Sequence, residues 1–517
     1  MRSQNDNNQD DGRGKRDDSV DAGPYNRVHD ADHPIEREGR ITMTHTRRNF
    51  LWQFGGGLGG IALTQLLAEA GELPGAPRPR PEFNGGLHHV AKVKRIIQLF
   101  MNGGVSQPDT FDYKPELEKR HDKPFTPGTG EKVEGVTSTP GNLMKSPFAF
   151  KQYGQCGRWV STVFPYLAKQ VDRMAFLMAL ASKSNVHGPA SYMMNTGFIL
   201  PGFPCMGAWL SYGLGRLSDN LPTFVVLPDA RGLPYNQKGN FGAGFLPAAH
   251  QGTILNASAD PPISDLSPSP KVSFVTPAAD RDALELLGKV NREHAKTRPD
   301  DSRLEARIES YELAAKMQQH APEALGLNRE SAKTRGKYGL DDPSTADFGR
   351  RCLLGRRLLE RGTRFVQVWS GAGGPTNNWD NHNDILTQLP PMAKSVDQPA
   401  AALLQDLHDR GMLADTLLVW STEFGRQPFT QGATGRDHNQ GTSVAWLAGA
   451  GVRGGVAHGE SDPWSWRAAE NKTYCYDLHA TILHLMGIDH AKLTVRHDGT
   501  NRRLTDVHGE VIEKILS

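Results

Sequence analysis

Apolar runs of seven or eight residues recur along this chain, and segments with helical periodicity separate many of them. The clearest runs are KRIIQLFM (94–101), MAFLMALA (174–181), PTFVVLP (222–228), RFVQVWS (364–370), TLLVWST (416–422) and SVAWLAG (443–449). Runs that are apolar at nearly every position are typical of strands buried on both faces. Strands that alternate with helices predict an α/β fold, in which a mostly parallel sheet is sandwiched by helices.

Three polar motifs stand beside the last three of these runs. WDNH (379–382) and STEFGR (421–426) each follow an apolar run, and GRDHN (435–439) precedes one. Parallel sheets bind ligands at the carboxyl ends of their strands, so we expect the three motifs to converge at one edge. Aspartate, glutamate and histidine together form the ligand set of a hydrolytic metal site. The candidate ligands are Asp380, His382, Glu423, Asp437 and His438.

The overall charge is balanced, with 59 basic and 57 acidic residues among 517 and a net charge of +2. Nothing in that balance indicates a nucleic-acid partner or an anionic membrane surface. The four cysteines lie far apart and form no CxxC pair, which excludes zinc-finger and thioredoxin motifs. One or two disulfides stay open for an exported protein.

The amino terminus has the order of an export signal. Residues 1–42 are polar and are expected to form no core, either as an extension or as a wrongly assigned start before Met43. Residues 43–70 contain an arginine pair at 47–48, a glycine-rich apolar stretch too short for a membrane span, and an A-x-A cleavage site at 68–70. This order resembles a twin-arginine signal and predicts a periplasmic or extracellular protein. The alternative is a basic patch before a surface helix.

The rest of the chain divides into a linker and one domain. Residues 71–91 are proline-rich, and residues 92–517 are predicted to form a single α/β domain. Within this domain, 281–330 is expected to be a helical insertion without strands. Other helices are expected at 156–172, 347–362 and 396–413. The helix at 347–362 should end at Gly362, since glycine is preferred just past a helix terminus.

Several strings carry a family resemblance. FMNGGVSQPDTFDYKPEL, SYELAAKMQ, RRLLERGTRFVQVW, WDNH, STEFGRQPF and TGRDHNQGTSVAWLAGAGVRGG resemble, in this order, the family called domain of unknown function 1501. The resemblance covers about residues 92–517. That family looks like a branch of the alkaline phosphatase-like superfamily, which includes sulfatases, phosphatases and cofactor-independent phosphoglycerate mutases. DTLLVWSTEFGR, HGPASYMMNTG and DLHATILHLMGI are similar to sulfatase segments that carry an Asp-His pair, the nucleophile and an Asp-x-x-Pro-Thr-Leu-Leu helix.

The departures from sulfatases are informative. His187 stands where a sulfatase has its modified cysteine, and Ser191 stands at the usual arginine. Glu423 and Phe424 replace the Asp-His pair, and Asn102 replaces a metal-binding aspartate. The resemblance therefore excludes an ordinary formylglycine sulfatase and predicts an incomplete two-metal site. The ligands that carry over are Asp380, His382, Glu423 and His438, and Asp109 or Asp112 is expected to replace the missing aspartate.

Each acidic candidate also has a structural interpretation. Asp380 could cap a turn while His382 faces solvent, but the two other matching motifs favour metal binding. Glu423 directly follows a buried strand, where an unpaired carboxylate is costly, so a metal or an arginine must compensate it. Arg426 either pairs with Glu423 or holds an oxygen of a phosphate or sulfate. Both roles of Arg426 stay open.

The histidines divide in the same way. His438 is expected to bind the metal while Asp437 orients it from behind. His187 precedes a predicted helix start at Pro189, where the backbone favours anions. The role of His187 stays open between metal ligand, general acid, nucleophile and structural histidine.

Together these residues predict an exported metal-dependent hydrolase of a phosphate or sulfate ester. Without Ser, Thr or Cys at the nucleophile position, a metal-bound water is the simplest attacking group. Mixed Asp, Glu and His ligands favour zinc or manganese over calcium. The expected substrate is a small-molecule or polysaccharide ester. The rival hypothesis is a non-catalytic binding protein that keeps the fold. The identity and number of the metal ions and the oligomeric state stay open.

Overall fold

The computed structural model describes residues 87–127, 133, 135–259, 276–298, 304, 307–308, 311–313 and 323–517. All of these residues belong to one compact unit, Pro77–Ser517. The expected extension, the twin-arginine signal and most of the linker lie outside the described residues. In the part of the chain that the structure describes, no helix is long and apolar enough to cross a bilayer.

A sheet of eight strands organises the described residues, and its order is β12-β4-β11-β8-β1-β7-β5-β6. The bounds are β1 (Arg95–Met101), β4 (Met174–Leu180), β5 (Phe224–Leu227), β6 (Thr253–Ile254), β7 (Phe365–Ser370), β8 (Thr416–Ser421), β11 (Ser443–Gly449) and β12 (Ala457–His458). All six predicted strands are present, each within two residues of its expected bounds. The other two strands, β6 and β12, are two residues long and form the edges.

One strand reverses direction. β11 pairs antiparallel with both β4 and β8, whereas every other neighbouring pair in this sheet is parallel. The mostly parallel sheet is confirmed, and the run 443–449 forms its one antiparallel strand among the described residues. Because of the reversal, the start of β11 lies at the same edge of the sheet as the end of β8. The motif before β11 therefore reaches the edge that the motifs after β7 and β8 also reach.

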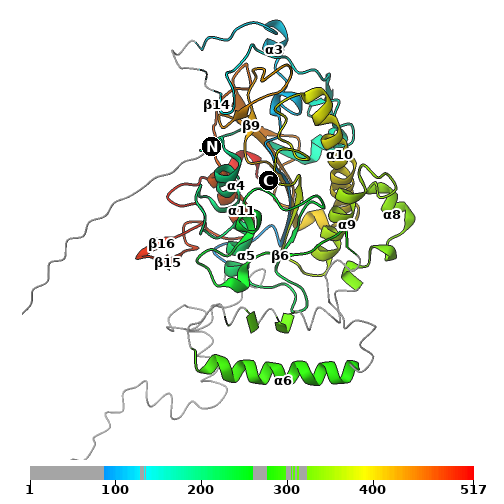
Figure 1. Ribbon diagram of the computed structural model, residues 1–517, viewed down its shortest axis with the longest axis vertical. Coiled ribbons are helices and arrows are strands. Elements are labelled where there is room, and N and C mark those ends of the chain that lie inside the picture. Colours follow the sequence, from blue (N-terminus) through cyan, green and yellow to red (C-terminus); the bar gives the residue numbers. More distant parts are fainter. Residues whose placement is uncertain are drawn as a thin grey trace, which may run out of the picture. The chain divides into compact units, whose positions relative to one another are not determined.

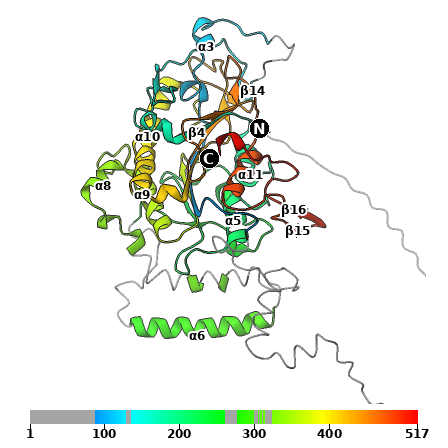
Figure 2. The same ribbon diagram turned by 180° about the vertical axis from the view of Figure 1, so that it is seen from behind.

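Helices cover both faces of the sheet, as two opposite views show (Figure 1, Figure 2). Helices α9 and α10 lie on one face, and α4, α5 and α11 lie on the other. Their bounds are α4 (His187–Thr196), α5 (Met206–Leu214), α9 (Ala346–Glu360), α10 (Ile385–Asp409) and α11 (Cys475–Leu485). This is the sandwich that the alternation of strands and helices predicts, and the α/β class is confirmed.

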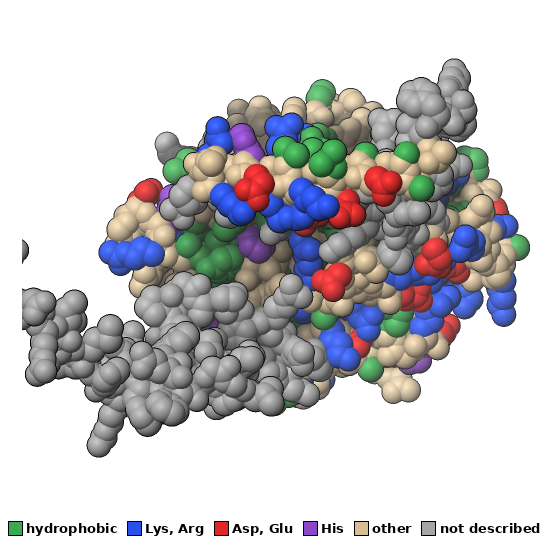
Figure 3. All heavy atoms as spheres, turned by 90° about the horizontal axis from the view of Figure 1, so that it is seen from below, with side chains coloured by type: hydrophobic (Ala, Val, Ile, Leu, Met, Phe, Trp, Pro, Cys, Tyr) green, Lys and Arg blue, Asp and Glu red, His purple; other side chains and the backbone are tan. Residues whose placement is uncertain are grey.

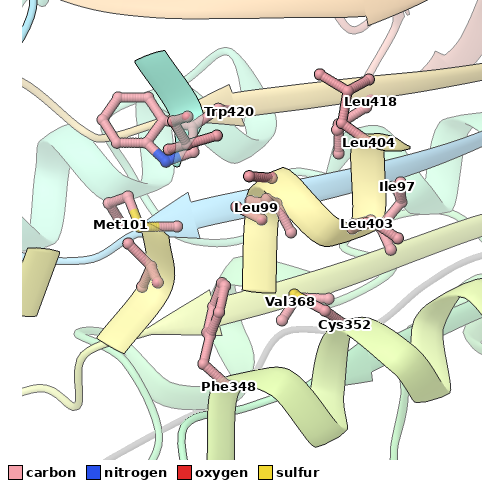
Figure 4. Packing of buried hydrophobic residues seen from close by; sticks show 14 of the residues in the cluster. Ile97, Leu99, Met101, Phe348, Cys352, Val368, Leu403, Leu404, Leu418 and Trp420 are labelled. Atoms are coloured by element: carbon pink, nitrogen blue, oxygen red, sulfur yellow. The ribbon is translucent and has the colours of Figure 1, made fainter. Parts of the chain in front are cut away.

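The layer between the sheet and helices α9 and α10 is a large apolar core. Ile97, Leu99 and Met101 of β1 cluster there with Leu403 and Leu404 of α10 (Figure 4). The intervening residues of β1 face the opposite layer, because successive strand residues point to opposite faces. Each fully buried side chain of this size stabilises the fold by about 1.5–3 kcal/mol. The core thus anchors the strands whose ends carry the motifs.

The ends of α9 and α10 show how local residues set helix bounds. Gly362 follows α9 in the left-handed conformation, with φ +95°, as expected for a glycine just past a helix. Helix α10 begins at Ile385 and not near 396, because Asp384 caps it by accepting a hydrogen bond from Leu386 N (3.0 Å). Its three internal prolines disfavour a helix, and packing of one face on the core compensates.

The expected helix at 156–172 is wrong. The structure has β3 (Arg158–Ser161) there, paired with β2 (Phe150–Tyr153), and then a short 3-10 helix, η2 (Leu167–Arg173). Over so short a segment, apolar spacing alone does not separate a helix from a strand followed by a turn. Pairing with β2, which no sequence pattern indicated, decides the outcome.

The expected helical insertion is present where the structure describes it. Helix α6 (Pro277–Lys296) is capped by the side chain of Thr276, and no strand occurs among the described residues of 281–330. Figure 3 shows acidic and basic side chains interspersed on one face of the protein, in line with the balanced net charge. All four cysteines are free thiols, so no disulfide forms among the described residues.

Short elements complete the described chain. They are η1 (Gln107–Asp109), α3 (Pro115–Lys119), η3 (Gln237–Phe241), η4 (Ala248–His250), η5 (Leu327–Arg329), α8 (Ala332–Lys337), η6 (Met412–Ala414), β9 (Gly425–Arg426), β10 (His438–Asn439), β13 (Glu460–Ser461), β14 (Ala468–Glu470), β15 (Val495–His497), β16 (Thr500–Arg502) and η7 (Glu513–Ile515). Of these, the antiparallel pair β9 and β10 matters most for the site, because it joins two of the three motifs.

Asp229 ties the ends of β5 and β7 together. Its Oδ2 accepts a hydrogen bond from Gly371 N (2.8 Å), while Arg231 and Arg351 lie 2.7 and 3.5 Å from the same oxygen. Burial opposes ionisation, but the two arginines and the Gly371 N–H hold the pKa of Asp229 down to about 2.

We expect Asp229→Asn to lower the free energy of unfolding by about 2 kcal/mol at neutral pH, which is the energy of a shift of ~2 pKa units. A depressed pKa stabilises the fold above the unfolded value and loses that contribution as the pH falls. The advantage of the wild type should therefore shrink between about pH 4 and pH 2. Urea unfolding of both proteins over this range measures it, and a difference independent of pH would contradict this origin.

Candidate metal centre

Three segments bring their polar side chains to the carboxyl edge of the sheet. His187 is the first residue of α4, which follows β4, and Asp380 and His382 lie in the segment after β7. His438 is on β10, just before β11, and it reaches this edge because β11 runs in the reverse direction. The edge at which ligands were expected to bind is therefore where these residues meet.

Four potential ligand atoms from these residues lie within 4.8 Å of one another. Asp380 Oδ1 is the centre of the group, at 3.2 Å from His187 Nε2, 2.7 Å from His382 Nε2 and 3.2 Å from His438 Nε2. Ligands at 2.0–2.2 Å from a tetrahedral zinc ion lie about 3.3–3.6 Å from one another. The four atoms are thus close to the spacing that a single ion requires.

The other nitrogen of each imidazole faces an oxygen acceptor. The pairs are His187 Nδ1 with Glu423 Oε1 (2.7 Å), His438 Nδ1 with the Asn185 carbonyl (2.7 Å), and His382 Nδ1 with Gln431 Oε1. An acceptor at Nδ1 keeps the proton there and leaves the Nε2 lone pair free to bind a metal. In all three histidines, the free ligand atom is therefore Nε2, which faces the shared carboxylate of Asp380.

His187 supplies a second sign that the group is suited to a cation. Its Nε2 is buried and forms no hydrogen bond with any described residue, although it lies 3.2 Å from Asp380 Oδ1. A buried polar atom without a partner is costly, and an ion at this place would give it one. The donor set of three imidazoles and one carboxylate fits zinc or manganese.

Burial and nearby charges shift the pKa values of three members of the group. Burial and the nearby Arg426 lower the pKa of His438 to about 4, although Asp380 acts in the opposite direction. Burial opposes ionisation of Asp380, but Arg426 and the imidazoles hold its pKa well below the usual range. His187 differs, because Asp380 and Glu423 outweigh its burial and raise its pKa. A proton on His187 is therefore the main competitor of a metal ion.

Arg426 is engaged by Asp380 and by backbone carbonyls. It does not pair with Glu423, and its side chain is fully buried beside Asp380, which it contacts through Nη2. Its Nε donates to Gly104 O (2.8 Å) and its Nη1 to Arg436 O (3.1 Å), while Nη2 also contacts Gly103 O. With its donors engaged in this way, Arg426 positions Asp380 and places a permanent positive charge behind it.

Glu423 was expected to bind the metal directly, but it lies behind the imidazole of His187. Its Oε1 accepts hydrogen bonds from His187 Nδ1 and Gly103 N (2.8 Å), and its Oε2 accepts one from Thr422 Oγ1 (3.1 Å). Glu423 is not one of the four clustered residues, and His187 takes the place in the cluster that was expected for Glu423. An unpaired carboxylate after a buried strand is compensated here by an imidazole and a backbone N–H rather than by an ion.

The remaining acidic candidates lie outside the cluster. Asp109 forms a fully buried ion pair with Arg436 (2.6 Å), and Asp112 lies 3.2 Å from Lys114 Nζ. Asp437 does not contact the imidazole of His438; it accepts a hydrogen bond from the backbone N–H of that residue (2.8 Å). The structure therefore does not bring these three carboxylates to the four ligand atoms.

Three residues that support the site were not predicted. Gln431 and the carbonyl of Asn185 orient two of the imidazoles, and Tyr235 stacks on the ring of His187 at 4.4 Å between centroids. Gln431 lies between two of the motifs, which is the one signal that could have indicated it. A backbone carbonyl such as that of Asn185 carries no sequence signal at all.

We expect Glu423→Ala to weaken metal binding about 10- to 100-fold without abolishing it, the usual effect of losing a residue that orients a ligand. Asp380→Ala, which removes the shared oxygen, should abolish binding. Competition with a chromophoric chelator measures both, and Glu470→Ala, an exposed glutamate of β14, is the matched control. Wild-type affinity in Glu423→Ala would contradict the orienting role.

Comparison with solved structures found sulfatases and alkaline phosphatases among the similar chains. The PsFucS1 sulfatase from Pseudoalteromonas sp. is 13% identical, with 77% of this chain and 68% of that chain covered and a TM-score of 0.32. BT1596, a 2-O GAG sulfatase, is 10% identical, with coverage of 82% and 74% and a TM-score of 0.35. The alkaline phosphatase from the Antarctic bacterium TAB5 is 10% identical, with coverage of 77% and 98% and a TM-score of 0.31.

All three TM-scores are low. A comparison with curated proteins found no match. The sequence pattern of one family, however, matches nearly the whole described domain. The chain belongs, over residues 93–516, to the family described as protein of unknown function (DUF1501).

Proposed function

We propose that this protein is a metal-dependent hydrolase of a phosphate or sulfate ester. The observation that carries the proposal is the convergence of three Nε2 atoms on Asp380 Oδ1 while each Nδ1 faces another oxygen. A neutral imidazole has one N–H and can satisfy only one of two acceptors. A cation at the Nε2 side satisfies all three imidazoles and the carboxylate together.

The residues that would hold the ion are His187, Asp380, His382 and His438. When bound, such an ion polarises an ester oxygen and lowers the pKa of a water molecule. Mixed nitrogen and oxygen ligands favour zinc or manganese over calcium. The chain itself supplies the positions of the ligands, through Glu423 behind His187 and Arg426 behind Asp380.

An anionic substrate group fits the surroundings of the site. His187 is the first residue of α4, so the amino end of this helix, which has no side-chain cap, lies beside the ligand atoms. Free backbone N–H groups and the helix dipole favour negative charge at such an end. The side chain of His382 is 19% exposed and that of His438 only 6%, so the group is more open to solvent on the His382 side.

Arg426 supports a site for a single ion. Its guanidinium is buried against Asp380 and is held by backbone carbonyls, so its positive charge stays beside Asp380. A second divalent ion on the same carboxylate would lie close to this fixed charge and would be repelled. We therefore infer one ion for each chain.

A non-catalytic role is the second candidate. Four protein ligands complete the tetrahedral coordination that is typical of structural zinc, whereas catalytic zinc usually has three. His187, at the position of the superfamily's nucleophile, supplies no hydroxyl or thiol. A protein that binds one ion tightly and hydrolyses neither ester would support this candidate.

The proposal predicts one equivalent of zinc or manganese after purification without chelators, together with turnover of an aryl phosphate or an aryl sulfate. Chelation should lower the melting temperature, because the ion binds only the folded state. Elemental analysis, calorimetry and the two assays make the test, with Asp380→Ala and His438→Ala as metal-free references. Wild-type protein that takes up no stoichiometric ion after reloading would refute the proposal.

Metal affinity should fall as the pH falls, because the raised pKa of His187 lets a proton compete with the ion at a higher pH than an ordinary histidine would. Below that pKa the affinity should fall up to about tenfold per pH unit, with one proton released per ion. The proton on His438, whose pKa is about 4, competes only in more acidic solution. Titration calorimetry in buffers of different ionisation enthalpy counts the protons, and binding without proton release would contradict this prediction.

Export is a further part of the proposal and rests on the amino-terminal sequence alone. We expect a mature protein that begins near Gly71, outside the cytoplasmic membrane. Replacing Arg47 and Arg48 together by Lys should leave the precursor in the cytoplasm. Fractionation and amino-terminal sequencing of the mature protein give the answer, and normal export of the double variant would exclude the twin-arginine route.

A further inference from the structure

A chain of hydrogen bonds connects Asp437 to the metal-ligand candidate His382. Asp437 accepts from backbone N–H groups on both oxygens: His438 N at Oδ1 (2.8 Å), and Val136 N (2.7 Å) and Thr137 N (3.0 Å) at Oδ2. Backbone N–H groups only donate, so the carboxylate acts as an acceptor in every one of these contacts. The fourth contact, from Thr137 Oγ1 to Oδ1 (2.9 Å), must then have the hydroxyl as donor.

Because Asp437 can only accept, the donor and the acceptor of each following hydrogen bond are fixed in turn. Thr137 gives its only proton to Asp437, so its oxygen is left to accept a hydrogen bond from Gln431 Nε2 (2.7 Å). With its NH2 group committed to Thr137, Gln431 turns its Oε1 to His382 Nδ1. An oxygen at this position demands a proton on Nδ1, which leaves Nε2 as the ligand atom. Thr137 itself is 3.5 Å from His382 Nδ1, too far to compete with its 2.9 Å bond to Asp437.

We infer that Asp437 fixes the tautomer of His382 through Thr137 and Gln431, and so holds this ligand ready to bind a metal. The inference rests on the proposed function for the role of the ion, but the protonation of Nδ1 belongs to the metal-free protein as well. Thr137 and Gln431 are positioning residues in this account, and neither touches the ion.

The tight turn at 135–138 explains why these groups stay in place. A Cβ on Gly135 would lie 1.7 Å from Ser138 O and 3.0 Å from Asp437 Oδ2, so this position requires glycine. The turn directs the N–H groups of Val136 and Thr137 at one carboxylate oxygen. Through Asp437, the turn therefore holds the segment that carries His438. Through Thr137 and Gln431, it also holds the ring of His382. One exposed turn supports two ligands from different motifs.

The opposite ring nitrogen of His382 lies 2.7 Å from Asp380 Oδ1, which also favours a proton. Without the hydrogen-bond chain, a neutral His382 would place its proton on Nε2 and donate to Asp380. An ion would then have to displace that proton before it binds. The chain from Asp437 opposes this tautomer and so raises metal affinity.

The test compares Thr137→Val with Thr137→Ser and with Thr139→Val, an exposed threonine two residues on that is outside the chain of hydrogen bonds. Without the threonine oxygen, the Gln431 amide is free to turn its NH2 to His382. We expect Thr137→Val to bind zinc about 10- to 100-fold more weakly, and the other two variants to bind as the wild type does. The melting temperature of metal-free Thr137→Val should stay near that of the wild type.

A second comparison separates tautomer control from a merely structural effect. The carboxylate of Gln431→Glu accepts a hydrogen bond from Nδ1–H whichever way it turns, so Thr137→Val should have little effect in a Gln431→Glu background. If the loss of affinity persists in the double variant, the hydrogen-bond chain does not act through the tautomer, and the inference fails.

Nitrogen-15 spectra of the histidines in the metal-free protein read the tautomer directly. At mildly alkaline pH, Nδ1 of His382, assigned by its loss in His382→Gln, should give a protonated signal in the wild type. That signal should change to the unprotonated type in Thr137→Val. Identical spectra in the two proteins overturn the inference whether or not zinc binds. Absence of zinc binding in the wild type with the expected spectra would instead refute the proposed function alone.

Discussion

The oxygen Oδ1 of Asp380 is the point on which the rest of the site depends. Three imidazole Nε2 atoms and one buried guanidinium face this single oxygen. Protonating all three rings would gather three positive charges beside Arg426, which is unfavourable in a buried place. The depressed pKa of His438, near 4, shows that this ring stays neutral. One divalent ion balances the same oxygen without that repulsion, and the surrounding residues are arranged as if for it.

The fold is what makes this convergence possible. Asp380, His382 and Glu423 follow parallel strands, while His438 precedes the reversed strand β11. Were β11 parallel to β8, the segment that carries His438 would start at the opposite edge of the sheet. The orienting residues follow the same logic, because each imidazole is held by an oxygen from a different segment. The site is therefore a product of the whole sheet edge and of no single motif.

Much of this arrangement could be predicted from the sequence, and the exceptions have physical reasons. The six buried strands were predictable because strands covered on both faces are apolar throughout. Asp380, His382 and His438 were predictable because each lies in a motif beside such a strand. The direction of β11 was not, because a buried run reads the same in either direction. Glu423 was expected among the ligand atoms but lies behind His187, whose role had stayed open, because the reach of a side chain across the edge depends on the turn that precedes it.

The supporting residues show a different limit. Gln431 and the carbonyl of Asn185 act through hydrogen bonds that only the folded chain brings together. Asp437 was expected to orient the ring of His438, yet it contacts only the backbone of that residue and reaches His382 through two others. Asp437 and His438 are adjacent in sequence, yet Asp437 supports His382 and not the ring of His438. The spacing of the two residues does not reveal this.

X-ray absorption at the metal edge of zinc-loaded protein tests the central claim most directly. Three imidazole nitrogens and one carboxylate oxygen should give light-atom scatterers at about 2.0–2.2 Å, with the outer-shell features of coordinated imidazole. Those features should weaken when any one of His187, His382 or His438 is replaced. A shell of oxygen atoms alone, or sulfur scatterers near about 2.3 Å, would show that the ion binds elsewhere and would contradict this account.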